Sequence, residues 1–236
     1  MKINRPVIKL TAKKYITTIR PSPVIFTLVY ILIVYILEYL TSRLNGYEQV
    51  LNDFSRYYYS GNDLSRYIPE LPIIPWYATA IIIAISLMSF MLSIGFSIYC
   101  LNVANRRSAS FANLFDGFNI FLKVIWLQIL AFVFVFLWSL IFIFPGIVAS
   151  YRYRQALFIM IENPDMSALE CIRASKKMMY GHKGELFVMD LSFLGWYLLT
   201  AVPFVSIWVL PYTEISYAIY YIALRDIPAG PQIVDI

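Results

Sequence analysis

The stretch Ile120–Phe144, IFLKVIWLQILAFVFVFLWSLIFIF, carries one charged residue, Lys123, close to its start. An α-helix rises 1.5 Å per residue, so about 20 apolar residues cross the hydrocarbon core of a bilayer, and this stretch is longer. Inside a membrane the backbone must satisfy its own hydrogen bonds, which a helix does. The stretch therefore predicts a helix that spans a membrane.

Further apolar runs lie between Pro23 and Leu224, and most charged residues fall between the runs. The 236-residue chain is 60 % hydrophobic and has a mean hydropathy of +0.68, whereas soluble domains are about 45–50 % apolar. The predicted fold class is all-α, a polytopic membrane helix bundle. We expect a basic segment at 1–22, the bundle at 23–225 and a short tail at 226–236.

The apolar runs predict about six spanning helices. Five lie near 24–40, 76–101, 120–144, 147–161 and 186–202, and the sixth ends near Leu224. Residues 41–74 are predicted to form an outer loop, and residues 163–181 an amphipathic helix on the inner surface. The run 147–161 is short for a span, so it is either a tilted helix or a re-entrant segment.

The formal net charge is +5, and the basic residues flank apolar runs instead of forming one solvated patch. This distribution argues against binding of nucleic acid and favours contact with anionic lipid head groups. Fourteen of the 19 Lys and Arg residues fall on the segments assigned to the inner side. By the positive-inside rule, both termini are therefore expected on the cytoplasmic side.

Two segments combine an apolar side with a basic side. In 1–22, apolar residues recur at helical spacing, which indicates either a helix on the membrane surface or a solvated positive tail. In 163–181, Ser167 and Glu170 have the spacing of a capping box. The basic residues expected to contact the membrane surface are Lys9, Lys13, Lys14, Arg173, Lys176 and Lys177.

A stripe of small residues, Ser89, Ser93 and Ser97, runs along the second predicted span. No hydrophobic force draws helices together in lipid, so small residues favour association by letting helices approach closely. We interpret the stripe as a helix-packing face.

Four charged residues fall within the predicted spans: Arg152, Arg154, Asp190 and Glu214. An isolated charge at the centre of a bilayer costs at least about 2.5–3.5 kcal/mol, so such groups normally face partners or water. One interpretation is a structural ion pair between one of the arginines and Asp190 or Glu214. The other is a polar cavity that recognises an anionic head group or solute.

Sites for catalysis or metal binding find little support. His182 is the only histidine, Cys100 and Cys171 are the only cysteines, and neither a nucleophile-elbow motif nor a phosphate-binding loop occurs. We therefore predict no catalytic residue, no metal site and no cofactor.

Several motifs resemble a known family. They are LFDGF at 114–118, FPGIVASYRYRQA at 144–156, NPDMSALECIRASKKMMYGHKGELFVMDLSFLGWYLL at 163–199 and LPY at 210–212. Together they are similar to a bacterial integral membrane family catalogued as domain of unknown function 975, over roughly residues 90–226. The resemblance implies a helical protein of the bacterial cytoplasmic membrane and assigns neither a substrate nor catalytic residues.

Three functions are consistent with these patterns. The first is a non-enzymatic membrane component that organises or assists lipids or other membrane proteins. Its expected partners are membrane lipids, including anionic head groups, and a membrane protein. The second is a carrier or lipid scramblase that uses the four charged residues within the spans. The third is immunity to a membrane-active peptide, and it rests only on the aromatic outer loop.

Overall fold

The computed structural model describes residues 3–61 and 74–227, and within these ranges the chain is all-α. The elements are α1 (Arg5–Thr18), α2 (Pro23–Leu44), α3 (Tyr47–Tyr59), α4 (Trp76–Ala104), α5 (Asn113–Asp116), the 3₁₀ turn η2 (Gly117–Ile120), α6 (Phe121–Ile141), α7 (Ile143–Tyr153), α8 (Ala156–Glu162), α9 (Ala168–Met178), α10 (Lys183–Leu199) and α11 (Pro203–Arg225).

In this part of the chain, three helices are long and apolar enough to cross a membrane: Pro23–Leu44, Trp76–Ala104 and Asn113–Ile141. They contain the first two predicted spans and most of the third, 120–144, since the third helix ends at Ile141, and they indicate a multi-pass membrane protein. The predicted outer loop is shorter than 41–74, because α2 continues to Leu44 and α3 occupies part of the loop. Residues 62–73 of that loop lie outside the described ranges.

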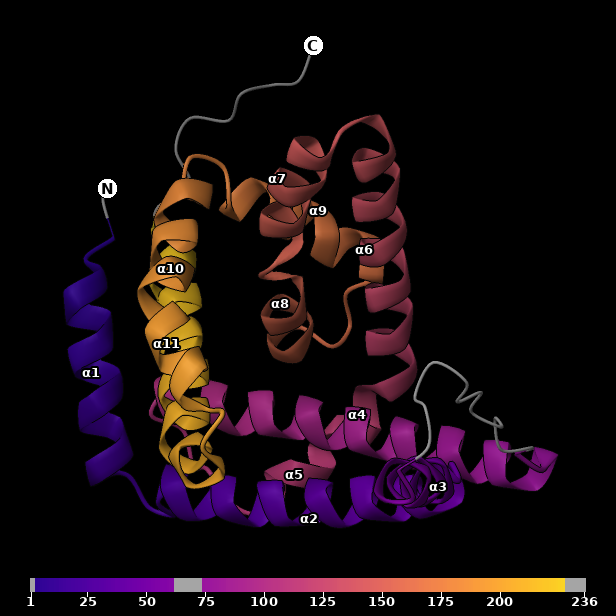
Figure 1. Ribbon diagram of the computed structural model, residues 1–236. Coiled ribbons are helices and arrows are strands. Elements are labelled where there is room, and N and C mark those ends of the chain that lie inside the picture. Colours follow the sequence, from indigo (N-terminus) through magenta and orange to yellow (C-terminus); the bar gives the residue numbers. More distant parts are fainter. Residues whose placement is uncertain (1–2, 62–73, 228–236) are drawn as a thin grey trace.

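The helices run in two main directions. Figure 1 shows α2 and α4 running across the view, whereas α1, α6, α10 and α11 run up it. Helices α2 and α4 contact each other, and both contact α11. This arrangement differs from a bundle in which all long helices lie side by side.

Two glycines explain how α4 meets the segment that precedes α6. A Cβ atom on Gly95 of α4 would lie 2.2 Å from the backbone oxygen of Leu114, and one on Gly117 would lie 2.4 Å from the backbone oxygen of Met91. Since neither glycine has a Cβ, the backbone of α5 and η2 packs directly on α4. The close approach at these glycines is made to a short segment instead of a long helix. It lies on a different face of α4 from the serine stripe, because Gly95 is two residues from both Ser93 and Ser97.

The fourth predicted span, 147–161, is two helices, α7 and α8, separated by Arg154 and Gln155. At this break the side chain of Ser175 from α9 enters the backbone: its hydroxyl donates to the carbonyl oxygen of Arg152 at 2.7 Å and accepts from the amide of Gln155 at 3.2 Å. A side chain inserted into a helical ladder interrupts the helix, which accounts for the break.

The chain reverses between α6 and α7 at Phe142, before the gap between the predicted spans 120–144 and 147–161. Phe142 has an extended backbone, with φ −159° and ψ 153°, and α7 begins at Ile143. Pro145 lies in the first turn of α7, where a proline lacks only an amide that has no helical acceptor. Gly146 allows close contact with Ser139 of α6, because a Cβ would lie 2.0 Å from the serine hydroxyl.

Helix α1 confirms that a helix precedes Pro21, but its apolar side is not left for the membrane surface. Ile8 and Ala12 are buried, and α1 contacts α11, α2 and α4. The protein itself therefore covers the side that the sequence assigned to lipid. Helix α9 has the predicted capping box at Ser167 and Glu170, and it contacts α8, α6 and α7.

Candidate functional site

The four charged residues predicted within the membrane lie on three parts of the fold. Arg152 is in α7, Arg154 follows α7 directly, Asp190 is in α10 and Glu214 is in α11. Between these arginines and these carboxylates the structure forms no ion pair in the described ranges. The predicted structural pair is therefore not made, and the four residues have different surroundings.

Asp190 is held by two tyrosines. Its Oδ2 accepts a hydrogen bond from the hydroxyl of Tyr151 at 2.9 Å, and its Oδ1 accepts one from the hydroxyl of Tyr217 at 2.8 Å. The Tyr217 hydroxyl also lies 3.3 Å from that of Tyr197. Asp190 thus joins α7, α10 and α11, and it needs no arginine to satisfy its oxygen atoms.

Replacing Tyr217 by phenylalanine is expected to destabilise the protein. The change removes one hydrogen bond to a charged acceptor, and bonds of that type contribute about 1.5–3 kcal/mol. Tyr35→Phe is a matched control, because Tyr35 in α2 is 67 % exposed. The measurement is the fraction of monodisperse protein left after heating in detergent. Equal melting of the two variants would contradict the assigned role of Asp190.

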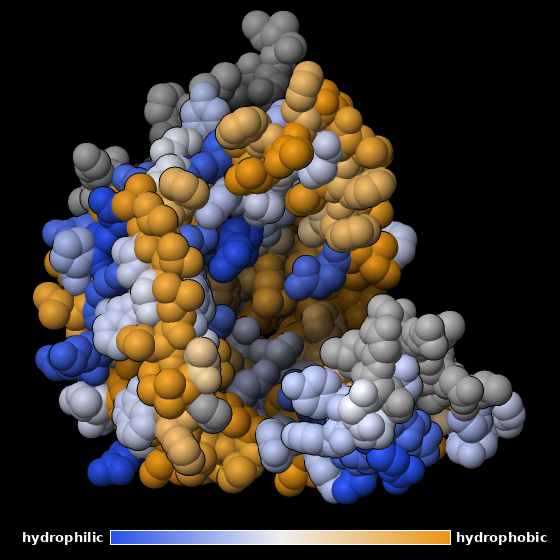
Figure 2. All heavy atoms as spheres, viewed as in Figure 1, coloured by the Kyte–Doolittle hydropathy of each residue, from blue (hydrophilic) through white to orange (hydrophobic). Residues whose placement is uncertain are grey.

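Arg154 and Glu214 line one cavity of about 490 Å³. We call it the polar cavity. Its wall is formed by α4, α6, the α7–α8 segment and α11, and it includes polar side chains such as Ser97, Gln128 and Tyr217. Figure 2 shows this face of the molecule hollowed between the column of α10 and α11 and the column of α6. The cavity brings together two of the four predicted residues.

The two charged groups in the polar cavity do not form an ion pair with each other. The Arg154 guanidinium lies over the ring of Tyr217, 5.2 Å from the ring centroid. Throughout the described residues, neither that guanidinium nor the Glu214 carboxylate has a hydrogen-bond or ion-pair partner. Arg154 is exposed and Glu214 is half-buried. Both groups are therefore free to bind a ligand.

A second cavity of about 290 Å³, which we call the inner chamber, adjoins the polar cavity. Four residues line both: Ser97, Gln128, Leu157 and Glu214. The other residues of the inner chamber are mainly apolar or aromatic, including Tyr30, Phe90, Phe96 and Leu210. Ser93 also lines it, so two serines of the α4 stripe face cavities. Ser89 is half-buried.

Arg152 lies outside the lining of the polar cavity. Its guanidinium lies over the ring of Trp138 in α6, 5.9 Å from the ring centroid. An arginine above an aromatic face gains a cation–π interaction in place of a carboxylate partner. Sequence reasoning grouped Arg152 with Arg154, but the structure separates the two.

The six basic residues expected at the membrane surface lie in two kinds of surroundings. The side chain of Lys9 points at α10, where its Nζ donates to the backbone oxygen of Ser192 at 3.3 Å and lies 4.2 Å from the centroid of the Phe193 ring. Burial, and then the nearby charge of Arg5, lower the pKa of Lys9. The remaining five are exposed: Lys13, Lys14, Arg173, Lys176 and Lys177.

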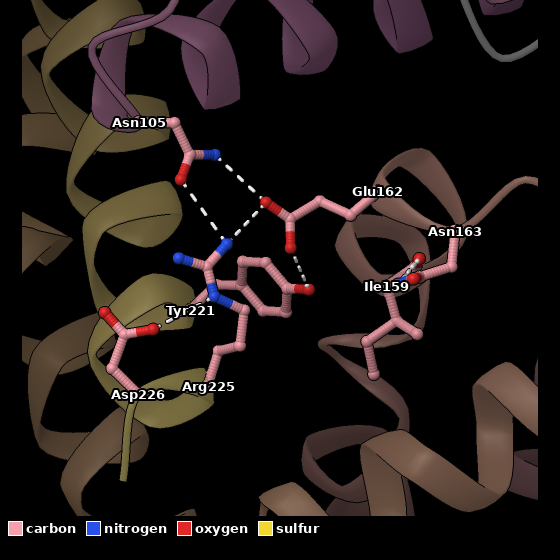
Figure 3. Close-up of polar contacts among 7 residues, drawn as sticks. All are labelled: Asn105, Ile159, Glu162, Asn163, Tyr221, Arg225 and Asp226. Atoms are coloured by element: carbon pink, nitrogen blue, oxygen red, sulfur yellow. Dashed lines mark hydrogen bonds and ion pairs between the residues drawn. The ribbon is translucent and has the colours of Figure 1, made fainter.

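A polar cluster that the sequence did not predict joins the ends of three helices (Figure 3). The carboxylate of Glu162 accepts hydrogen bonds from Arg225 at 2.6 Å, Tyr221 at 2.8 Å and Asn105 at 3.0 Å. Burial opposes ionisation of Glu162, but the bonds from Arg225, Tyr221 and Asn105 outweigh it and lower the pKa of this carboxyl. The cluster is structural, because each polar group faces another.

The described residues contain no group of three or more His, Cys, Asp or Glu side chains that could hold a metal ion. Cys100 and Cys171 are buried thiols. The Nδ1 atom of His182 lies 2.9 Å from a carboxylate oxygen of Glu185 in the next turn.

Residues 143–227 match the model of a family described as Protein of unknown function (DUF975). The match covers α7 to α11, including all four charged residues discussed above, and it confirms the resemblance seen in the sequence over that range. The motif at 114–118 lies outside it. No curated protein and no solved structure matches the chain.

Proposed function

We propose that this chain is a non-enzymatic, multi-pass protein of the bacterial cytoplasmic membrane that binds the head group of a membrane lipid in the polar cavity. By holding lipid at that site it would organise lipids and assist the membrane proteins around it. The observation that carries the proposal is the unpartnered guanidinium of Arg154 in a cavity whose wall includes α6.

The chemistry of the cavity supports a lipid as the ligand. A guanidinium forms two parallel hydrogen bonds with a phosphate, so a phospholipid head group would satisfy Arg154. The α6 side of the cavity includes Leu127, Phe132 and Val135, and Phe132 is 69 % exposed. Because α6 belongs to a candidate membrane span, acyl chains can lie along this apolar face while the head group enters the cavity.

The topology of six membrane segments with both termini in the cytoplasm stays a prediction, because α2 and α4 run across α6, α10 and α11 and the two sets do not share one direction. Helix α11 has 23 residues and α10 has 17, and α7 and α8 together form a broken return segment. The turn between α6 and α7 supports insertion into hydrocarbon, because Phe142, Ile143 and Phe144 are 73–80 % exposed. The five exposed basic residues of α1 and α9 suit anionic head groups at the cytoplasmic surface.

Lipid retained after purification in mild detergent tests the proposal. We expect the wild type to retain phospholipid and Arg154→Gln to retain at least about tenfold less, because the change removes the charged partner of the phosphate. Arg107→Gln is the matched control, since Arg107 is an exposed arginine outside the cavity lining. Equal retention by folded wild type and folded Arg154→Gln would refute the proposal.

A second candidate function, a carrier or lipid scramblase, is favoured by the joined cavities. A path that continues past Glu214 from the polar cavity into the inner chamber could pass a head group between leaflets. The test is bleaching of fluorescent lipid by dithionite in reconstituted vesicles. If vesicles that contain folded protein show no more lipid movement than protein-free vesicles, this function is excluded.

A further inference from the structure

The polar cavity contains one basic and one acidic side chain that form no ion pair with each other. Arg154 and Glu214 are the charged residues among those that line it, and both lack an ion-pair partner within 3–61 and 74–227. A charge removed from water without a partner is costly, so a ligand is favoured when it satisfies both groups. The two opposite charges therefore define the chemistry of the ligand more narrowly than the requirement for a phosphate alone.

A ligand with one kind of charge would satisfy only one of these residues. An anion would pair with Arg154 but bring a negative charge towards Glu214, and a cation would have the opposite problem. A zwitterion with its two charges a few bonds apart avoids both repulsions. A phosphate diester accepts hydrogen bonds from a guanidinium, and a primary ammonium donates up to three, which a carboxylate accepts.

The depths of the two residues indicate the orientation of such a ligand. Arg154 is exposed at the polar cavity, whereas Glu214 is half-buried and also lines the inner chamber. The ammonium would therefore lie deeper than the phosphate. Hydrocarbon chains attached on the far side of the phosphate would leave the cavity along α6, next to Phe132. In phosphatidylethanolamine the chains, phosphate and ammonium follow one another in this order.

We infer that the polar cavity selects a phospholipid whose head group carries a phosphate and a terminal primary ammonium, with the phosphate at Arg154 and the ammonium at Glu214. This inference rests on the proposed lipid-binding function and names its substrate class. A quaternary ammonium, as in phosphatidylcholine, has no N–H to donate to Glu214 and is bulkier. A head group without an amine, as in phosphatidylglycerol, leaves Glu214 unpartnered.

The test offers the detergent-solubilised protein an equimolar mixture of phosphatidylethanolamine, phosphatidylcholine and phosphatidylglycerol with identical acyl chains. Retained lipids are quantified by mass spectrometry. We expect the wild type to enrich phosphatidylethanolamine at least about tenfold over each of the others. In Glu214→Gln that enrichment should fall about tenfold, and Glu214→Asp, which keeps the carboxylate, should retain the preference.

The outcomes separate this inference from the proposed function. If the wild type retains phosphatidylglycerol as well as phosphatidylethanolamine, the inference is wrong, but lipid binding stands. This comparison needs no variant, so it remains decisive even if Glu214→Gln does not fold. If the wild type retains no more lipid than Arg154→Gln, the proposed function fails as well. Free phosphoethanolamine should displace the lipid only at about 100-fold higher concentration, and displacement at equal concentration would indicate a soluble ligand and overturn the inference.

Discussion

Gly95→Ala is expected to destabilise the protein strongly, although it adds only one methyl group to α4. The added Cβ would meet the backbone oxygen of Leu114 at 2.2 Å, the backbone carbon of Leu114 at 2.6 Å and the backbone oxygen of Asn113 at 2.7 Å. No side-chain rotation relieves contacts with backbone atoms, so α5 would have to move away from α4. Overpacking of this kind costs about 1–3 kcal/mol and sometimes more, and we expect a value near 3 kcal/mol.

The matched control is Gly195→Ala in α10, where an added Cβ meets no heavy atom within 4 Å. Alanine is favoured over glycine inside a helix by about 1 kcal/mol, so this variant should be as stable as the wild type or more stable. The two glycine variants are compared by their midpoints of thermal unfolding in detergent, which size-exclusion chromatography monitors. A Gly95→Ala protein that melts with the wild type would show that α5 does not pack on α4 as described.

Long apolar runs made much of the fold predictable. A run such as Ile120–Phe144 has one stable conformation in hydrocarbon, and the capping box at Ser167 and Glu170 is a local signal that needs no tertiary information. The crossing of α4 over the segment before α6 was not predictable. It depends on Gly95 meeting Leu114, and a glycine in sequence does not reveal which backbone lies against it.

The candidate site was predictable in its residues but not in its pairing. The rule that charged groups inside a membrane face partners or water singled out Arg154, Asp190 and Glu214 as polar positions of interest. The sequence prediction assumed that these opposite charges form ion pairs with each other. Asp190 is instead satisfied by hydroxyl groups of Tyr151 and Tyr217, and tyrosine is so common in this chain that its partners cannot be read from sequence.

The break between α7 and α8 was also not predictable from the sequence, because it depends on a side chain from another helix. Ser175, on the helix after the break, satisfies the carbonyl oxygen of Arg152 and the amide of Gln155. A serine 20 residues away gives no local signal for this contact. The cluster around Glu162 was missed for the same reason, since its members come from the ends of three helices that are far apart in sequence.

Arg225→Met is expected to cause the second large loss of stability, by leaving the carboxylate of Glu162 without its charged partner. The side chain of Glu162 is 9 % exposed and that of Arg225 is 35 % exposed. Breaking a fully buried pair from one side costs about 3–5 kcal/mol, and the partial exposure of Arg225 reduces the expected loss to about 2–3 kcal/mol. Glu48→Gln is the control, because its ion pair with Arg43 is on the surface and should contribute nothing measurable.

The pH dependence of unfolding separates this ion pair from a simple packing contact. The hydrogen bonds to Glu162 overcome its burial and lower its pKa below the ordinary value of 4.5 in the folded protein. A carboxyl with a lowered folded pKa binds more protons when unfolded, so its contribution is complete above pH 4.5 and is lost as the pH falls through the folded pKa. The wild type should therefore lose stability in acid, whereas Glu162→Gln should be less stable at pH 7 and lose less below pH 4.5. Parallel pH profiles for the two proteins would show that Glu162 is not held as an ionised group by Arg225.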